Sequence, residues 1–126
     1  MGQGFLSDTN VVIAAIDNQL PSAGAAFIKP LPPDISVITQ IELLGWYGAS
    51  QDKLAPIADF LNKANIYPLT PAIVAQTITL RQSYKIKTPD AILAATALVH
   101  DLTLLTRNTA DFKQIPGLRL VNPFDL

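Results

Sequence analysis

Short apolar runs alternate with longer stretches of helical periodicity along the chain. Runs of three or four apolar and β-branched residues predict strands, whereas apolar residues that recur three and four positions apart predict helices. The predicted strands are residues 5–7, 34–37, 66–69, 103–106 and 119–121. The predicted helices are residues 9–17, 39–49, 52–65, 71–84, 89–100 and 109–115, and Pro56 fits the third of these only if it lies in the first turn.

Strands separated by helices predict a parallel sheet with right-handed crossovers and helices on both faces. The expected fold class is therefore α/β, a three-layer α/β/α arrangement around a five-stranded, mostly parallel sheet. The length of 126 residues suits one hydrophobic core, so we expect a single domain spanning residues 1–126.

Four acidic residues lie close to the starts of predicted helices, and we interpret them as a candidate catalytic cluster: Asp8, Glu42, Asp90 and Asp111. Three of them follow predicted strands, and the loops after the strands of a parallel sheet form its ligand site. Asp90 follows a helix instead. Because its own helix leads into a strand that starts at the opposite edge, we expect Asp90 at the same edge as the other three.

Each acid also has a structural explanation. Helix starts favour acidic side chains, and residues 39–42, 88–90 and 108–111 fit capping patterns, while Asp8 could itself cap a helix. Capping does not require that four acids face one cleft, however. Neighbouring carboxylates raise one another's pKa unless a cation lies between them, so a shared cleft favours a bound cation over capping alone.

Composition limits which cation could bind. The chain has no Cys and a single His, His100, so a metal must be held by oxygen ligands. Carboxylate oxygens suit Mg²⁺ or Mn²⁺, and such ions activate water for phosphodiester hydrolysis. The formal net charge of −1 excludes a strongly basic nucleic-acid-binding protein. Any groove for nucleic acid must be a local patch.

The order and spacing of these motifs resemble those of PIN-domain ribonucleases, specifically VapC-type toxins of toxin–antitoxin pairs. The resemblance covers essentially the whole chain. It rests on Leu6-Ser7-Asp8-Thr9-Asn10, on Thr39-Gln40-Ile41-Glu42-Leu43, on residues 87–97 around Thr88-Pro89-Asp90-Ala91, on residues 105–112 around Thr106-Arg107-Asn108, and on Pro116-Gly117-Leu118.

The resemblance implies a Mg²⁺- or Mn²⁺-dependent ribonuclease that hydrolyses RNA phosphodiesters without a protein nucleophile. Asp8 and Asp90 would be the principal metal ligands, and Glu42 and Asp111 would complete the cluster. Thr106 and Asn108 would orient ligands or water from behind them. Arg107 is the favoured contact to the RNA backbone. Further cations near the expected cleft are Arg81, Lys85, Lys87 and Lys113.

Charged residues make up only 15% of the chain, against about 25% in an ordinary globular protein, which indicates a partner chain or self-association. The resemblance implies an antitoxin tail as the partner and a toxin homodimer. Candidates for a partner groove are Trp46, Tyr47, Phe60 and Leu61. Without a signal peptide pattern or an apolar run of about 18 residues, we expect a cytoplasmic protein with no membrane segment.

Two other functions are compatible with parts of this pattern. A PIN-like domain without catalysis would serve as an RNA-binding or scaffold module. A receiver-type signalling domain also has an acidic magnesium pocket, but it requires adjacent acids after its first strand, where this chain has Asp8 alone, and a Lys after its fifth, where it has Asn122-Pro123. Nucleotide-binding glycine loops are absent from the sequence.

Overall fold

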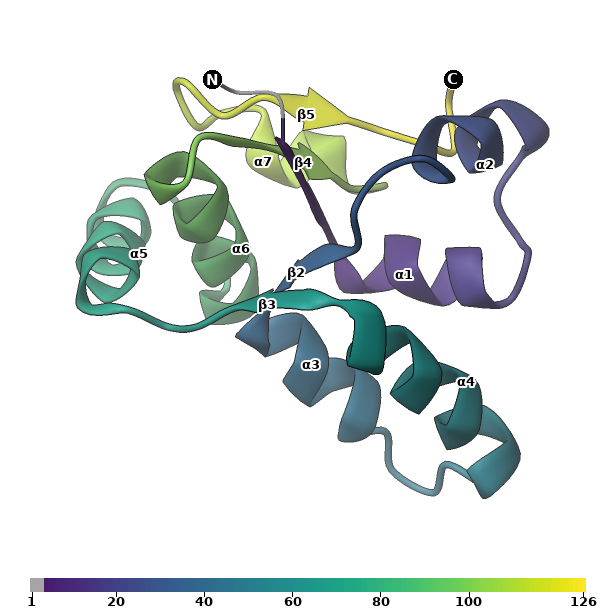
Figure 1. The fold of residues 1–126 in the computed structure, drawn as a ribbon. Coiled ribbons are helices and arrows are strands. Elements are labelled where there is room, and N and C mark those ends of the chain that lie inside the picture. Colours follow the sequence, from purple (N-terminus) through teal and green to yellow (C-terminus); the bar gives the residue numbers. More distant parts are fainter. Residues whose placement is uncertain (1–3) are drawn as a thin grey trace.

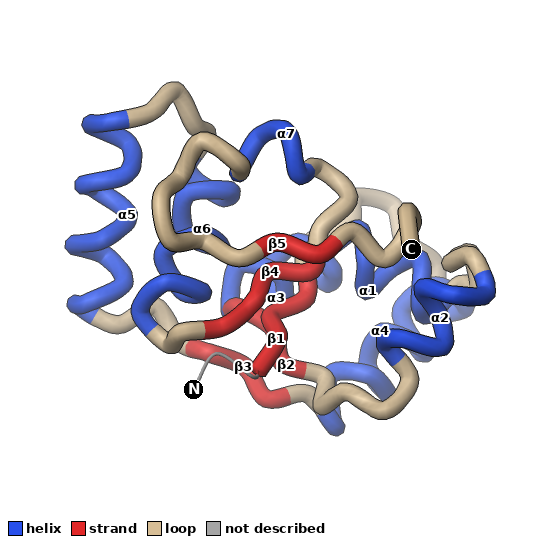
Figure 2. Tube along the Cα trace, turned by 90° about the horizontal axis from the view of Figure 1, so that it is seen from above, coloured by secondary structure: helices blue, strands red, loops and turns tan. Residues whose placement is uncertain are grey.

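All hydrogen-bonded strand pairs in the computed structural model, which describes residues 4–126, are parallel. One ladder joins β1 (Gly4–Ser7), β4 (Leu102–Leu105) and β5 (Leu120–Val121), and a second joins β2 (Asp34–Ser36) to β3 (Asn65–Tyr67). Because β2 lies beside β1, the strands follow the spatial order β3, β2, β1, β4, β5 (Figures 1 and 2). The expected five parallel strands are present, and their ladder is interrupted between β1 and β2.

The helices form the outer layers. They are α1 (Thr9–Ile16), α2 (Ser22–Ile28), α3 (Val37–Leu44), α4 (Gln51–Lys63), α5 (Pro71–Ser83), α6 (Thr88–Val99) and α7 (Thr109–Phe112). Figure 2 shows α5 and α6 on one side of the strands and α1, α2 and α4 on the other. The expected α/β/α class is confirmed. No helix in the described part of the chain is long and apolar enough to cross a membrane.

The strand that pairs with β1 is the centre of the core. Every residue of β4 is buried, and Leu104 packs with Leu6 of β1 and Phe112 of α7. Helix α6 approaches this cluster through a face of small residues, chiefly alanine, which lets its backbone pack closely on the sheet. A second cluster, around Ile35 and Leu43, joins β2 to α1, α3 and α4. These two clusters fix the strand ends relative to the helix starts.

Two predicted helix starts are wrong. Helix α3 begins at Val37, where the Ser36 hydroxyl accepts a hydrogen bond from the Ile38 N–H at 3.1 Å. Thr39 is therefore a fully buried residue inside the helix rather than its cap, and Glu42 lies in the second turn. Ser36, the last residue of β2, lies almost one turn before Thr39 and caps the helix instead. In α6 the cap is the residue before Thr88, although Asp90 keeps its expected place in the first turn.

The position of Pro56 in its helix also differs from the prediction. Helix α4 begins at Gln51, so this proline is the sixth helical residue and lies beyond the first turn. Its missing N–H leaves one backbone hydrogen bond of the helix unmade. Ile57 beside it is buried in the second core cluster. Tertiary packing of the apolar face therefore outweighs the local preference of proline.

Helix α2 was not predicted from the sequence. It has few large apolar residues and a glycine, Gly24, in its interior, so both periodicity and propensity are weak. The structure gives the reason for the glycine: a Cβ atom there would lie 1.8 Å from the carbonyl oxygen of Pro123. The helix is thus held by close backbone contact with the C-terminal segment, which no local pattern reveals.

We expect Gly24→Ala to destabilise the protein by about 1–3 kcal/mol, because overpacking against rigid backbone exceeds the helix propensity that alanine gains. Urea denaturation would measure the free energy of unfolding. Ala23→Gly, at an exposed position of the same helix, is the control and should cost about 1 kcal/mol or less through propensity alone. A Gly24→Ala variant more stable than the parent would contradict the packing described here.

Candidate active site

Asp8 is the most buried carboxylate at the end of the sheet. It follows β1 directly, it is 6% exposed, and its side chain caps α1 by accepting the Thr9 N–H at 2.6 Å. The Thr106 hydroxyl donates to the other carboxylate oxygen at 2.8 Å. Burial raises the pKa of Asp8, the two hydrogen bonds oppose that rise, and the nearby charge of Glu42 adds to it. The carboxylate is held in place but is costly to ionise.

Thr106 is itself fixed by the backbone. It follows β4, is fully buried, and accepts the Asn108 N–H at 3.0 Å while donating to Asp8. Its own N–H bonds to the Val121 carbonyl of β5. Thr106 therefore holds one oxygen of the Asp8 carboxylate, and its role in orienting a ligand stays a prediction. Asn108 contributes its backbone N–H to this arrangement, and its side chain makes no capping bond to α7.

Glu42 reaches the same region from α3. Its Oε1 lies 2.5 Å from the Thr9 hydroxyl, which is also 3.1 Å from the Thr39 hydroxyl. Since a hydroxyl has one proton, Thr9 donates to the carboxylate and can accept from Thr39. The sequence motifs included Thr9 and Thr39 without giving either of them this role. Two features of the sequence could have indicated these contacts. Thr9 comes directly after Asp8, and Thr39 lies almost one helical turn before Glu42.

Asp90 shares its electrostatic environment with the other three acids. It lies half-buried in the first turn of α6. Burial is the main reason that the pKa of Asp90 is raised, and the charges of Asp8, Asp111 and Glu42 raise it further, in that order, against the opposing charge of Lys87. The other three carboxylates are thus close enough to disfavour the ionised form of Asp90, as like charges do.

The four acids do not form a complete set of ligands for one metal ion. Within residues 4–126, no three carboxylate or imidazole side chains lie close enough together to ligate one ion. Hydrogen bonds explain the separation, because Asp8 is directed toward Thr106 and Glu42 toward Thr9. His100 lies at the other end of α6 from Asp90, ten residues or roughly 15 Å along the helix. Any ligand set would therefore consist of oxygen atoms drawn together by the ion.

A cleft of about 750 Å³ opens beside the cluster. Asp90, Asn108 and Asp111 line it, together with the basic side chains of Arg81, Lys85, Lys87 and Lys113. The favoured RNA contact, Arg107, is not among the lining residues. Its guanidinium carbon lies 4.6 Å from the centre of the Phe124 ring, which is a cation–π contact with the C-terminal segment.

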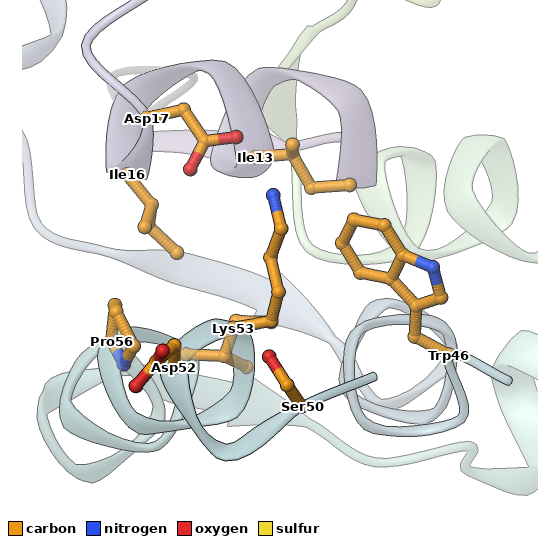
Figure 3. Close-up of a pocket in the computed structure, with 9 residues that line it drawn as sticks. Ile13, Ile16, Asp17, Trp46, Ser50, Asp52, Lys53 and Pro56 are labelled. Carbon is orange, nitrogen blue, oxygen red and sulfur yellow. The ribbon is translucent and has the colours of Figure 1, made fainter. Parts of the chain in front are cut away.

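A second, smaller pocket of about 250 Å³ lies between the end of α1 and the start of α4. Figure 3 shows Lys53 extending past Trp46 between the two helices, with Ile13 and Ile16 opposite. The Lys53 ammonium is 5.3 Å from the centre of the Trp46 ring. Trp46 is 44% exposed and Tyr47 is 98% exposed, so large apolar surface borders the pocket. Of the four partner candidates, the structure exposes these two, whereas Phe60 and Leu61 pack against the second core cluster.

The chain matches known proteins over nearly all of its length. A PIN domain profile matches residues 5–118. Ribonuclease VapC1 of Rickettsia felis is 27% identical over 94% of this chain and 95% of its own length. The tRNA(fMet)-specific endonuclease VapC of Shigella flexneri is 29% identical over 91% of this chain and 94% of its own.

A solved structure, a toxin–antitoxin complex from Klebsiella pneumoniae, is 35% identical, covers 98% of this chain and 100% of its own, and superimposes with a TM-score of 0.75. None of these matches is to a receiver-type domain. The resemblance inferred from the sequence motifs is confirmed: the chain belongs to the PIN-domain family, and the relatives it matches here are VapC-type nucleases and a toxin–antitoxin complex.

Proposed function

We propose that this protein is the ribonuclease toxin of a toxin–antitoxin pair and hydrolyses RNA phosphodiesters with Mg²⁺ or Mn²⁺. One observation carries the proposal: at the sheet edge where ligands bind, burial and the charges of the other three acids raise the pKa of Asp90, and burial and the charge of Glu42 raise the pKa of Asp8. Such repulsion is relieved when a dication lies among the carboxylates. The names of the VapC relatives, a ribonuclease and a tRNA endonuclease, support the choice of RNA.

The donor set fits a hard cation. The described acids offer only oxygen atoms, which Mg²⁺ and Mn²⁺ prefer. Asp8 and Asp90 would hold the ion, with Glu42 and Asp111 bound directly or through water. When bound, the ion supplies an activated water and neutralises charge at phosphorus. Asp8 is the most strongly oriented donor, since two hydrogen bonds fix its carboxylate.

The remaining residues would position these donors. Thr106 holds one oxygen of Asp8, and the Thr9 N–H holds the other. Thr9 restrains Glu42 by a hydrogen bond, so the Glu42 side chain has lost part of its freedom before an ion binds. Arg107 remains a proposed RNA contact, because stacking on the Phe124 ring uses the face of the guanidinium and its in-plane N–H groups can still donate to phosphate.

We expect Asp8→Asn and Asp90→Asn each to lower Mn²⁺-dependent RNA cleavage by about 100-fold or more. Each substitution removes a charged ligand from an ion that stabilises the transition state by several kcal/mol. Cleavage of structured RNA by purified protein would be followed on gels, with EDTA as the metal-free reference. Asp59→Asn, an equal charge change at an exposed site on α4, is the control. Equal cleavage by the parent and both ligand variants would refute the assignment.

We expect Asp90→Asn to raise the melting temperature by a few degrees in metal-free buffer at neutral pH. The folded-state pKa of Asp90 is raised, so the native protein loses stability as pH rises from about 3.8, the ordinary value, through the folded value. The Asp90→Asn variant does not lose this stability, so its higher melting temperature should disappear at pH values below about 3.8. Saturating Mn²⁺ should reverse the order, because only the parent binds the ion tightly. Thermal melts at a series of pH values, with and without Mn²⁺, measure both effects. An Asp90→Asn variant that is less stable than the parent without metal would contradict the electrostatic repulsion at Asp90.

The partner would be an antitoxin whose tail docks at the pocket beside Trp46. The solved relative is a toxin–antitoxin complex, and this chain has exposed apolar side chains on α3 and the turn after it, Ile41, Leu44 and Tyr47 among them. Exposed apolar surface of this kind marks protein interaction sites. We also propose that the toxin pairs with itself, as its low charge content suggests.

Co-expression with the product of the adjacent reading frame should give a stable complex. We expect Trp46→Ala to weaken that complex by about tenfold or more, because aromatic side chains dominate binding energy at interfaces. Calorimetry or a pull-down from purified components would measure the change. Val99→Ala, an exposed apolar residue at the end of α6, is the control. Undiminished binding by Trp46→Ala would place the partner elsewhere.

A further inference from the structure

Thr9 forms hydrogen bonds with two of the four acids. Its backbone N–H donates to Oδ1 of Asp8 at 2.6 Å, and its hydroxyl donates to Oε1 of Glu42 at 2.5 Å. Asp8 follows β1, whereas Glu42 lies on α3, 33 positions after Thr9 in the sequence. A single residue therefore connects a carboxylate at the end of a strand with a carboxylate on a separate helix.

A second hydroxyl continues this connection into the protein interior. The side chain of Thr39 is fully buried, and its hydroxyl lies 3.1 Å from the Thr9 hydroxyl. Within residues 4–126 the Thr9 hydroxyl is the only hydrogen-bond partner of this side chain. Because a buried hydroxyl proton without an acceptor is costly, Thr39 donates to the Thr9 oxygen, and the Thr9 proton is directed to Glu42. The two threonines form a hydroxyl chain, Thr39 to Thr9 to Glu42, in which each proton has one acceptor.

The packing of α1 against α3 holds the hydroxyl chain in place. Val12 lies three residues after Thr9 on α1 and is buried in the second core cluster. Leu43 lies four residues after Thr39 on α3 and is buried in the same cluster. Thr39 and Glu42 are three residues apart, so their side chains lie on the same face of α3. The hydroxyl chain thus crosses between two helices whose relative position is fixed by the core.

The other two acids have no comparable support. Within residues 4–126, the carboxylate of Asp90 accepts no hydrogen bond, and Asp111 accepts one only at its backbone carbonyl, from Gln114 at 3.5 Å. The four acids are therefore of two kinds, because Asp8 and Glu42 are held by hydrogen bonds before an ion arrives. A side chain that is already restrained loses less freedom on binding, and preorganisation of this kind raises affinity.

We propose that the hydroxyl chain positions Glu42 and thereby raises the affinity of the acidic cluster for a divalent cation. The inference rests on the proposed function, which supplies the cation and names Glu42 among its ligands. Thr9 holds Oε1 of Glu42 and leaves Oε2, which has no hydrogen-bond partner within residues 4–126, available to the ion. Thr39 makes no hydrogen bond to any of the four acids there and acts through Thr9, because a hydroxyl that accepts a hydrogen bond donates more strongly.

Threonine-to-valine substitutions remove each hydroxyl and keep the branched shape. Thr9→Val retains the backbone N–H that binds Asp8, and the two residue types have similar helix propensities. We expect Thr9→Val to raise the Kd for Mn²⁺ about tenfold, because the ion must then order the Glu42 side chain itself. Thr39→Val should raise the Kd about threefold, because Thr9 still has a proton to donate. Calorimetry with MnCl₂ and RNA-free protein measures both values.

Two sets of variants serve as controls. Thr77→Val removes a buried hydroxyl that bonds to the Ile73 carbonyl within α5, at 2.7 Å, and it should leave the Kd for Mn²⁺ unchanged. Thr9→Ser and Thr39→Ser keep the hydroxyls and should bind Mn²⁺ like the parent. Thermal melts identify any variant that does not fold. If Thr39→Val unfolds, Thr9→Val, at a half-buried position, still tests the inference.

Repeating the valine substitutions in a Glu42→Ala background separates positioning from a general disturbance of the site. If the hydroxyl chain acts through the Glu42 carboxylate, Thr9→Val should change the Kd less than twofold in that background. An equal loss of affinity in both backgrounds would overturn the inference. A Thr9→Val variant that binds Mn²⁺ as tightly as the parent, or more tightly, would overturn it as well, because the hydroxyl would then not assist ion binding.

RNA cleavage by the same proteins tests the proposed function separately. A parent that binds Mn²⁺ with this coupling to Glu42 but never cleaves RNA overturns the nuclease and supports the hydroxyl chain. A parent that cleaves RNA with Mn²⁺, and in which the coupling is absent, overturns the hydroxyl chain and leaves the nuclease. A parent that binds no Mn²⁺ overturns the inference, and cleavage of RNA by that parent in EDTA would indicate a nuclease that works without the ion.

Discussion

The parallel pairing of β1 with β4 is the constraint on which the site depends. It sets Ser7 beside Leu105, so that the next residue, Asp8, donates its N–H to the Leu105 carbonyl at 2.9 Å. The same pairing brings the Thr106 hydroxyl to the Asp8 carboxylate, across 98 positions of sequence. Burial of both strands in one apolar cluster supplies the free energy that holds this register. Without this strand pairing, neither the Asp8 carboxylate nor the Thr106 hydroxyl would be in place.

That core also stabilises an arrangement that is unfavourable by itself. Burial raises the pKa of Asp8 and of Asp90, and the neighbouring carboxylates add to the rise at both. Hydrogen bonds offset only part of this cost. Functional sites commonly retain such locally destabilising charges because activity requires them. Within residues 4–126 no three of the acids lie close enough together to ligate one ion, so ion binding would require their side chains to move.

The sequence predicted the fold class and the approximate position of every strand, because periodicity and buried apolar runs are local signals. It predicted where three acids follow strands, and the direction of α6 placed Asp90 with them. The cap of α3 was wrong because Ser36 and Thr39 both fit a capping pattern, and only packing of Thr39 in the interior decides between them. Helix α2 depends on a contact with Pro123, which is distant in sequence.

The group of basic side chains that lines the cleft beside Asp90 was only partly foreseen for a similar reason. Its lysines were recognisable as candidates, but their grouping opposite Asp111 depends on how α7 packs beside the connection between α5 and α6. Arg107 was preferred because it lies between Thr106 and Asn108 in the sequence. Neighbours in a chain can face different ways, and this side chain turns to the Phe124 ring instead. The roles of all these residues in binding and catalysis remain predictions.

The acids and the cations of this region are attached to the fold in different ways. Asp8 and Thr106 follow directly on β1 and β4, whose Leu6 and Leu104 are fully buried, so a change in their positions would disturb the core. Most of the cations, by contrast, stand on a short surface connection and just after a helix of four residues. Surface connections tolerate insertion and substitution far better than buried strands. The two exposed segments can therefore change in length and sequence without displacing Asp8 or Thr106 from their places beside the core.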